Sequence, residues 1–439
     1  MAQFSDGIRP IFPIQKKMSN SIVKNLDWVS VILYLLLVSC GWIAIFSTTY
    51  SDLKATSLFD LNQFYGKQLL FIALSFLLIL FILAIDSKLY INLAVTFYLI
   101  AIVLLAGLFV FGKETNGARA WYAIGSITVQ PSEFAKVATA LAFSRYVSDI
   151  HTDVRRIPDL LRAIAIICIP SFLILLQPDV GSLLVFFSLL FVLFREGMPS
   201  ALLFYLFLAG VVFVSSLKFG TGLTLLASAL CIGFYVFWHK RRTNRIPFAN
   251  LFILSGICLV TALATHPAYD NVLKQHHRNR LSLWLRLETD PQKIAAMKRD
   301  FAYNTNMAES AITSGGTLGK GFLQGTRTKG SFIPEQHTDY IFTTIGEEWG
   351  FAGTTLVVVL FALLLLRLLQ LAERQKTKFN RVYGYCVVSI LFVHFCINIG
   401  MVISLIPTIG IPLPFFSYGG SGLWAFTILL FIFLRLDAR

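Results

Sequence analysis

Long apolar runs alternate with short polar connectors along almost the whole chain. Twelve runs lie near residues 27–48, 65–86, 89–111, 131–148, 160–177, 180–195, 201–218, 222–238, 248–266, 341–368, 384–405 and 418–436. A helix needs about 20 apolar residues to cross the hydrocarbon core of a bilayer. The runs are continuously apolar and do not alternate, which excludes a transmembrane β-barrel. We therefore predict an all-α polytopic membrane protein with about 12 transmembrane helices.

The composition of the chain supports this prediction. Of its 439 residues, 56% are hydrophobic and 14% are charged, whereas about 25% are charged in a typical soluble protein. All six cysteines lie within apolar runs, and none has the spacing of a metal site. These features exclude an ordinary soluble enzyme, a disordered chain and a secreted disulfide scaffold.

The formal net charge of +14 is concentrated in a few connectors. Lys and Arg gather before the first run and between the fourth and fifth, the eighth and ninth, and the tenth and eleventh runs. With twelve spans these connectors share one side of the membrane, and basic loops mark the cytoplasmic side. We therefore predict that both termini lie in the cytoplasm. The charge is explained by topology and not by nucleic-acid binding.

Polar stretches divide the chain into four parts. Residues 1–26 are expected to be a cytoplasmic segment without a cleavable signal, and 27–266 an N-terminal bundle of about nine helices. Residues 267–340 would form a large extracytoplasmic loop, and 341–439 a C-terminal bundle of three helices. Loops of this length are usually functional or disordered, and the aromatic and glycine content here favours order. We therefore expect the active site in 267–340.

The second half of this loop carries two motifs. Segment 314–321 is rich in glycine but lacks the Walker spacing. It predicts a close backbone approach to a phosphate or sugar, and a flexible re-entrant turn is the alternative. Segment 334–339 places Glu335, His337 and Asp339 just before a membrane entry, where a solvated helix cap is the alternative.

The first half of the loop offers cations and a carboxylate. Arg278 and Arg280 fit a pyrophosphate through paired hydrogen bonds, or alternatively anionic lipid headgroups. Asp290 precedes Pro291 and follows an apolar segment that bears Trp284. A carboxyl group beside apolar surface has a raised pKa and suits a general base, whereas an Asx turn before proline is the alternative.

Charged residues also occur within the apolar runs, where they are costly and usually face a cavity or a partner. Glu133 and Lys136 lie three residues apart on one helix face, which predicts a local ion pair. Asp179 follows a proline between two runs and suits a helix cap. Segment 398–422 is too rich in proline and glycine for a plain helix, and it predicts a re-entrant wall that lines a site.

In this order, the motifs resemble the SEDS family (shape, elongation, division and sporulation), and its RodA branch more than its FtsW branch. The resemblance extends from about residue 27 to the C-terminus. It is carried by Asn116–Trp121, Gln130–Lys136, Gln177–Gly181, Pro334–Phe342, Gly346–Gly350 and Asn398–Gly422. The family usually has ten helices, so the resemblance implies that an extra hairpin lies near 201–238.

The resemblance implies a peptidoglycan glycosyltransferase that polymerises lipid II into glycan strands at the outer face of the plasma membrane, during cell elongation and rod-shape maintenance. A class B penicillin-binding protein would be the crosslinking partner. The donor would be a glycan on undecaprenyl pyrophosphate, and the acceptor the GlcNAc 4-hydroxyl of lipid II, with inversion at the donor carbon. An essential aspartate of the family matches Asp290. Because the stretch from 290 to 303 is longer than usual, Asp300 is a second candidate.

These implied roles define the residues to examine. Asp290 would be the general base, which typically contributes about 10²–10⁴-fold. The departing pyrophosphate needs positive charge, for which the candidates are Arg119, Arg278, Arg280, Lys320 and, more weakly because of its acidic neighbour, Lys136. A divalent cation, Mg²⁺ or Mn²⁺, is the alternative source, although no metal-ligand set is evident. The remaining expected substrate contacts are Trp121, Glu335, His337, Asp339 and Ser417.

Two other functions are consistent with the same sequence. A lipid II flippase or other lipid transporter would use the intramembrane charges along a translocation path. Transporters usually have internal repeats and midplane sites, whereas here no repeat is evident and the ionisable clusters lie toward the exterior. A non-catalytic scaffold of the cell-wall machinery would tolerate replacement of the exterior carboxylates.

Overall fold

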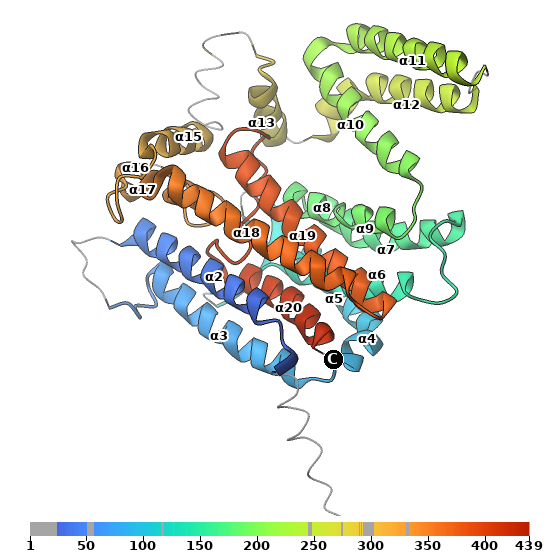
Figure 1. Cartoon of the computed structure of the whole chain (residues 1–439). Coiled ribbons are helices and arrows are strands. Elements are labelled where there is room, and N and C mark those ends of the chain that lie inside the picture. Colours follow the sequence, from blue (N-terminus) through green and yellow to red (C-terminus); the bar gives the residue numbers. More distant parts are fainter. Residues whose placement is uncertain are drawn as a thin grey trace, which may run out of the picture.

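Long helices dominate the computed structural model, which describes residues 24–50, 57–115, 118–125, 127–244, 248–273, 275–288, 290, 292, 303–330 and 333–438 (Figure 1). Within these ranges, ten helices are long and apolar enough to cross a membrane: α2 (Trp28–Thr49), α3 (Phe64–Ala84), α5 (Ala94–Phe111), α7 (Ile157–Leu176), α10 (Ser200–Phe219), α11 (Thr221–Thr243), α12 (Phe248–Pro267), α18 (Gly350–Glu373), α19 (Lys378–Val402) and α20 (Gly420–Asp437). The chain is therefore a multi-pass membrane protein, and the predicted all-α fold is confirmed.

Two of the twelve predicted spans form shorter helices. Run 131–148 forms α6 (Pro131–Val147), whose 17 residues are mostly buried between other helices. Run 180–195 divides into α8 (Val180–Phe186) and α9 (Leu189–Arg195). The count of about twelve spans therefore becomes ten long helices plus these shorter apolar ones within the described residues.

The predicted span 341–368 is also divided. Its first part is α17 (Ile341–Glu348), and α18 starts again at Gly350. Gly350 has a φ of +62°, and a Cβ there would lie 2.3 Å from the backbone nitrogen of Gly319. Glycine therefore permits both the turn and the close approach of the loop.

Several short elements connect the long helices. They are α4 (Ser87–Asn92), the π-helix η2 (Ala268–Val272), α13 (Gln275–Leu285), α15 (Tyr303–Gly315) and α16 (Thr326–Lys329). A small antiparallel sheet, which the sequence did not predict, lies between α5 and α6, with strands β1 (Lys113–Thr115), β2 (Ala118–Ile124) and β3 (Ile127–Val129) in the order β1-β2-β3. Tyr122 of β2 fastens it by donating a 2.8 Å hydrogen bond to the carbonyl of Leu104 in α5.

The main core forms where α6, α19 and α20 pack together. In α20, 72% of the apolar window is buried, whereas only 6% is buried in α11. Helices α10, α11 and α12 pack mainly on one another around a separate small core of Val212, Cys258 and Ala262. Figure 1 shows α11 and α12, in green to yellow, standing apart from the main bundle. Residues 201–238 lie in α10 and α11 of this unit; because ten helices of the described residues are long enough to span a membrane, the extra hairpin expected there stays a prediction.

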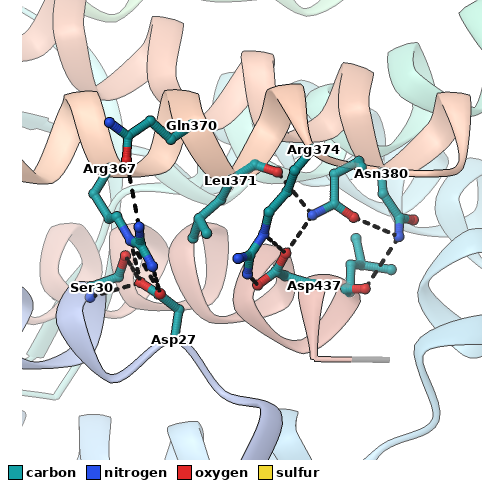
Figure 2. Close-up of polar contacts among 10 residues, drawn as sticks. Asp27, Ser30, Arg367, Gln370, Leu371, Arg374, Asn380 and Asp437 are labelled. Atoms are coloured by element: carbon teal, nitrogen blue, oxygen red, sulfur yellow. Dashed lines mark hydrogen bonds and ion pairs between the residues drawn. The ribbon is translucent and has the colours of Figure 1, made fainter.

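Ion pairs join the ends of α2, α18 and α20 (Figure 2). Arg367 of α18 donates from Nε to both carboxylate oxygens of Asp27, at 3.2 Å each, and Asp27 also caps α2. Arg374 lies 2.6 Å from a carboxylate oxygen of Asp437 at the end of α20. These contacts fasten α2, α18 and α20 at one end, because breaking one would leave a poorly hydrated carboxylate without its cation.

Candidate functional site

A cavity of about 510 Å³ lies between α13, α15 and the turn at residues 404–408. Two guanidinium groups, Arg280 and Arg286, line it together with the carboxylates of Glu288 and Glu309 and the hydroxyl of Thr305. Its size falls within the range of small-ligand sites. Arginine pairs in such a hollow suit a phosphate or pyrophosphate, because the planar guanidinium offers paired donors.

Helix α13 is fastened to the turn by two side chains one helical turn apart. Arg280 donates from Nη1 to the carbonyl of Thr408 at 3.3 Å, and Trp284 donates from Nε1 to the carbonyl of Leu405 at 3.2 Å. On the opposite wall, the Thr305 hydroxyl lies 2.9 Å from that of Thr408, and the Tyr340 hydroxyl lies 3.3 Å from each. Hydrogen bonds therefore connect the residues of the cavity wall. The Arg280 guanidinium group is held in place by its bond to the carbonyl of Thr408.

The segment that ends in Asp339 forms a turn behind this wall. Asn398 of α19 donates from Nδ2 to the carbonyls of Asp339, at 2.9 Å, and Ile411, at 2.6 Å. The Ser417 hydroxyl donates to the carbonyl of Thr338 at 2.7 Å and accepts from the Leu413 amide at 2.8 Å. Residues 403–419 are thus the non-helical wall expected from their sequence. Ser417, an expected substrate contact, uses its hydroxyl to hold this wall to the turn.

Three carboxylates and one guanidinium group surround this turn. Burial, with the negative charges of Glu335 and Asp179, raises the pKa of Asp339 to about 7, although the Arg280 guanidinium group acts in the opposite direction. Asp179 caps α8 and accepts a 2.9 Å hydrogen bond from Gln130, so its predicted role as a cap is confirmed. Asp339 therefore keeps its proton to higher pH than an ordinary carboxyl group, and its charge interacts with that of Arg280, a cation of the cavity.

His337 is packed between aromatic rings. Its ring centroid is 4.2 Å from that of Phe64 and 5.6 Å from that of Tyr418. Burial lowers the pKa of His337, while Glu335 raises it slightly. Glu335 itself is exposed and adopts a φ of +56°, and its carbonyl accepts the amides of Thr338 and Tyr340. The neutral, stacked imidazole supports the turn from the membrane side.

Asp290 lies on an exposed loop beyond the end of α13. Its Oδ1 accepts a 2.9 Å hydrogen bond from the Gln292 amide, and its own amide donates to Glu288 Oε1 at 3.2 Å. The Asx-turn geometry is therefore present, and Glu288 joins the loop to the cavity wall. Asp300, the second candidate, lies outside the described residues. The role of Asp290 as a base stays a prediction.

Two of the five candidate cations are bound by the protein's own carboxylates. Lys320 Nζ lies 2.6 Å from Oε1 of Glu347, which is fully buried and also accepts the amides of Arg327 and Thr328. Lys136 lies 2.7 Å from Glu133 inside the bundle, as predicted from their spacing. It also lies 2.9 Å from Nε2 of His394 in α19, and its side chain is 2% exposed. Neither ammonium group faces the cavity.

The remaining cations are placed differently. Arg119 is exposed on β2 and lies 3.8 Å from Glu114, and Trp121 on the same strand is half-buried. Arg278 is half-buried on α13, and its buried Nε has no hydrogen-bond partner among the described residues. Of the five candidates, Arg280 is the one that lines the cavity. Arg286, which the sequence reasoning did not select, lines it as well.

The glycine-rich segment 314–321 makes its close approach to the protein's own backbone. A Cβ at Gly315 would lie 2.0 Å from the carbonyl oxygen of Gly346, and one at Gly319 would lie 2.1 Å from that of Glu348. The Lys320 amide donates to the carbonyl of Glu347 at 3.0 Å. The segment therefore packs on α17, which explains the glycines without a phosphate or sugar.

The described residues contain no group of three His, Cys, Asp or Glu side chains placed to hold a metal ion. This set does not include Asp300 or its neighbours at 293–302. A divalent cation, the alternative source of positive charge, therefore stays a prediction.

The sequence profile of the FtsW/RodA/SpoVE family, described as cell cycle proteins, matches residues 27–219 and 205–439. The chain therefore belongs to this family. The peptidoglycan glycosyltransferase MrdB of Escherichia coli is 32% identical over 357 residues, which is 80% of each chain. The peptidoglycan glycosyltransferase RodA of Treponema pallidum is 28% identical over 441 residues, covering 95% of this chain and 98% of that one.

The fold also matches known structures. A structure reported under the words "structural coordination of polymerization and crosslinking by a peptidoglycan synthase complex" has a TM-score of 0.67 and 25% identity, and the match covers 94% of this chain and 97% of that one. A crystal structure of the rod shape determining protein RodA of Thermus thermophilus has a TM-score of 0.58 and 23% identity, over 94% of this chain. The expected family resemblance is confirmed.

Proposed function

We propose that this protein is a peptidoglycan glycosyltransferase that polymerises lipid II at the outer face of the plasma membrane. The observation that carries the proposal is the match along nearly the whole chain to relatives that bear this name. The cavity beside Arg280 and Arg286 supports it, because such a hollow suits the diphosphate of a lipid-linked donor. The resemblance to the RodA branch favours a role in cell elongation and rod-shape maintenance.

In the proposed reaction, the diphosphate of the donor lies against the guanidinium groups of the cavity. Asp290 takes the proton from the 4-hydroxyl of the acceptor GlcNAc as that oxygen attacks the anomeric carbon of the donor. The bond from this carbon to the diphosphate oxygen breaks, and the carrier diphosphate leaves with the bonding electron pair. The two arginines stabilise the negative charge on the leaving group. Attack opposite to the leaving group inverts the configuration.

The site is proposed to face the exterior, and both termini to face the cytoplasm. This orientation is supported by the basic connectors, because loops rich in Lys and Arg mark the cytoplasmic side. The structural neighbour reported as a synthase complex supports a crosslinking partner. We propose a class B penicillin-binding protein for that partner.

The test is polymerisation of labelled lipid II by the purified protein in liposomes, with and without a class B penicillin-binding protein. Asp290→Asn should abolish glycan synthesis and leave folding intact. Asp149→Asn is a matched control, because Asp149 is also exposed and its Oδ1 also accepts the amide two residues later at 2.9 Å. Near-normal synthesis by Asp290→Asn would exclude it as the base. A parallel Asp300→Asn variant decides between the two carboxylates.

A lipid II flippase is the second candidate, supported by the buried Lys136, Glu133 and His394 network in the bundle. The same liposomes separate the two functions. A flippase would move labelled lipid II between leaflets without forming polymer, and its transport would survive Asp290→Asn. Polymer formation that is lost in this variant alone supports the glycosyltransferase.

A further inference from the structure

A second cavity, of about 920 Å³, lies in the three-helix unit, which directly precedes the loop that bears Asp290 in the sequence. It runs between α10, α11 and α12 as a groove with mostly apolar walls. Phe204, Leu208 and Phe219 contribute from α10, and Leu254 and Cys258 from α12. The groove therefore offers apolar surface at membrane depth.

Two hydroxyl groups that line this groove are bonded to carbonyls of their own helix or its N-cap. The Thr224 hydroxyl donates to the carbonyl of Gly220 at 2.9 Å, and the Ser228 hydroxyl donates to the carbonyl of Thr224 at 2.8 Å. Both residues line the groove from α11. A polar ligand would find few free partners here, whereas an acyl chain needs none. The mostly apolar walls therefore favour a hydrocarbon chain as the ligand.

The groove-lining face of α11 continues into a basic cluster. Ser228, Tyr235 and Arg242 are spaced by seven residues, so they lie on one face of the helix. Tyr235 lines the groove, and Arg242 lies about 10 Å further along the axis. Lys240, Arg241 and Arg242 fill the last turn and are all exposed. A ligand that follows this face passes from apolar walls to cations.

The charge of this cluster is not balanced by a carboxylate within the described residues. None of Lys240, Arg241 and Arg242 pairs with a carboxylate among the described residues. At other helix ends, by contrast, arginines pair with carboxylates. Arg367 pairs with Asp27, and Arg374 pairs with Asp437. Three uncompensated cations at a membrane interface attract the phosphate of an anionic lipid.

We propose that this groove is a binding site for an anionic phospholipid, with its acyl chains between α10, α11 and α12 and its phosphate against Lys240 and Arg242. The proposal concerns lipid binding and is independent of the glycosyltransferase reaction.

The test measures lipid retention by the purified full-length protein in detergent, using native mass spectrometry. The probes are dioleoyl phosphatidylglycerol and dioleoyl phosphatidylcholine. The Lys240→Gln/Arg242→Gln double variant should weaken phosphatidylglycerol binding by a factor on the order of 30. Lys376→Gln/Lys378→Gln removes equal charge from another connector and should change binding less than threefold.

A groove-filling variant tests the acyl part of the site. Ser228→Phe should reduce phosphatidylglycerol retention although every cation remains, and thermal melting verifies that the variant is folded. If Ser228→Phe fails to fold, the comparison of Lys240→Gln/Arg242→Gln with Lys376→Gln/Lys378→Gln still tests the proposal. Equal retention of both lipids by the unmodified protein, or equal losses in both double variants, would show annular or unspecific surface binding and overturn the proposal.

Discussion

The pH dependence of stability should be dominated by Asp339, whose pKa is raised from 3.8 to about 7. Between these two values the folded protein keeps a proton on Asp339 that the unfolded chain has released. Stability therefore falls as pH rises through this interval. A shift of this size corresponds to roughly 4 kcal/mol, which is lost in full above pH 7.

Replacing Asp339 with Asn keeps the neutral shape and removes the ionisation. We expect the apparent melting temperature of the wild type in detergent to fall by several degrees between pH 5 and pH 8.5, and that of Asp339→Asn to change much less. Arg280→Gln removes a cation that lowers the pKa of Asp339. The fall in melting temperature should therefore continue to higher pH in that variant.

The measurement is a thermal melt of the purified protein across this pH range, with Asp149→Asn as the control for an exposed aspartate. Asp149→Asn should retain the wild-type profile. A wild-type melting temperature that rises with pH through this interval would contradict the reasoning, as would an Asp339→Asn profile identical to that of the wild type.

Three further predictions concern the loop that packs on α17 and the leaving group. Gly319→Ala places a Cβ 2.1 Å from the Glu348 carbonyl oxygen at a φ of +82°, and should lower the free energy of unfolding by about 1–3 kcal/mol, as measured by thermal melting. Gly316→Ala, with a φ of +59° and open space around the Cβ, should lower it by about 1 kcal/mol. Lys320→Met should cost about 3–5 kcal/mol because it leaves the buried Glu347 without its cation, and the added Glu347→Gln should restore most of that stability; no recovery in the double variant would refute the ion-pair argument. Removal of divalent cations with EDTA should slow lipid II polymerisation, and added Mg²⁺ or Mn²⁺ should restore it; unchanged rates would leave the arginines as the source of positive charge.

The helices were predictable because hydrophobicity alone determines where a chain can cross a membrane. The exceptions have a local cause. Helix α6 begins at Pro131 and carries Glu133 and Lys136, yet it lies inside the bundle because these charges pair with each other and the ammonium group also contacts His394. The break before Gly350 was invisible in the hydrophobic pattern, because it depends on a glycine that meets a distant loop.

The sequence located the motifs of the site but not their partners. Lys320 and Glu347 are 27 residues apart, and Lys136 and His394 are 258 apart. The spacing of residues along the sequence does not predict such contacts, because they form only when the helices pack together. Composition therefore made Lys320 look like a free phosphate ligand, whereas tertiary packing uses it to neutralise a buried carboxylate.

The ion pairs of the candidate cations indicate which of them can bind the leaving group. Lys136 and Lys320 are paired with buried carboxylates, and Arg119 lies beside Glu114 at the exposed sheet. The Nη1 of Arg280 donates to a backbone carbonyl, which does not neutralise it, although the carboxylates of Glu288 and Glu309 line the same cavity. Because the pKa of Asp339 is raised to about 7, its negative charge develops as pH rises through this region, and it competes less for Arg280 at lower pH. A diphosphate that enters the cavity at lower pH therefore meets a guanidinium group that is positioned by the turn and not neutralised by it.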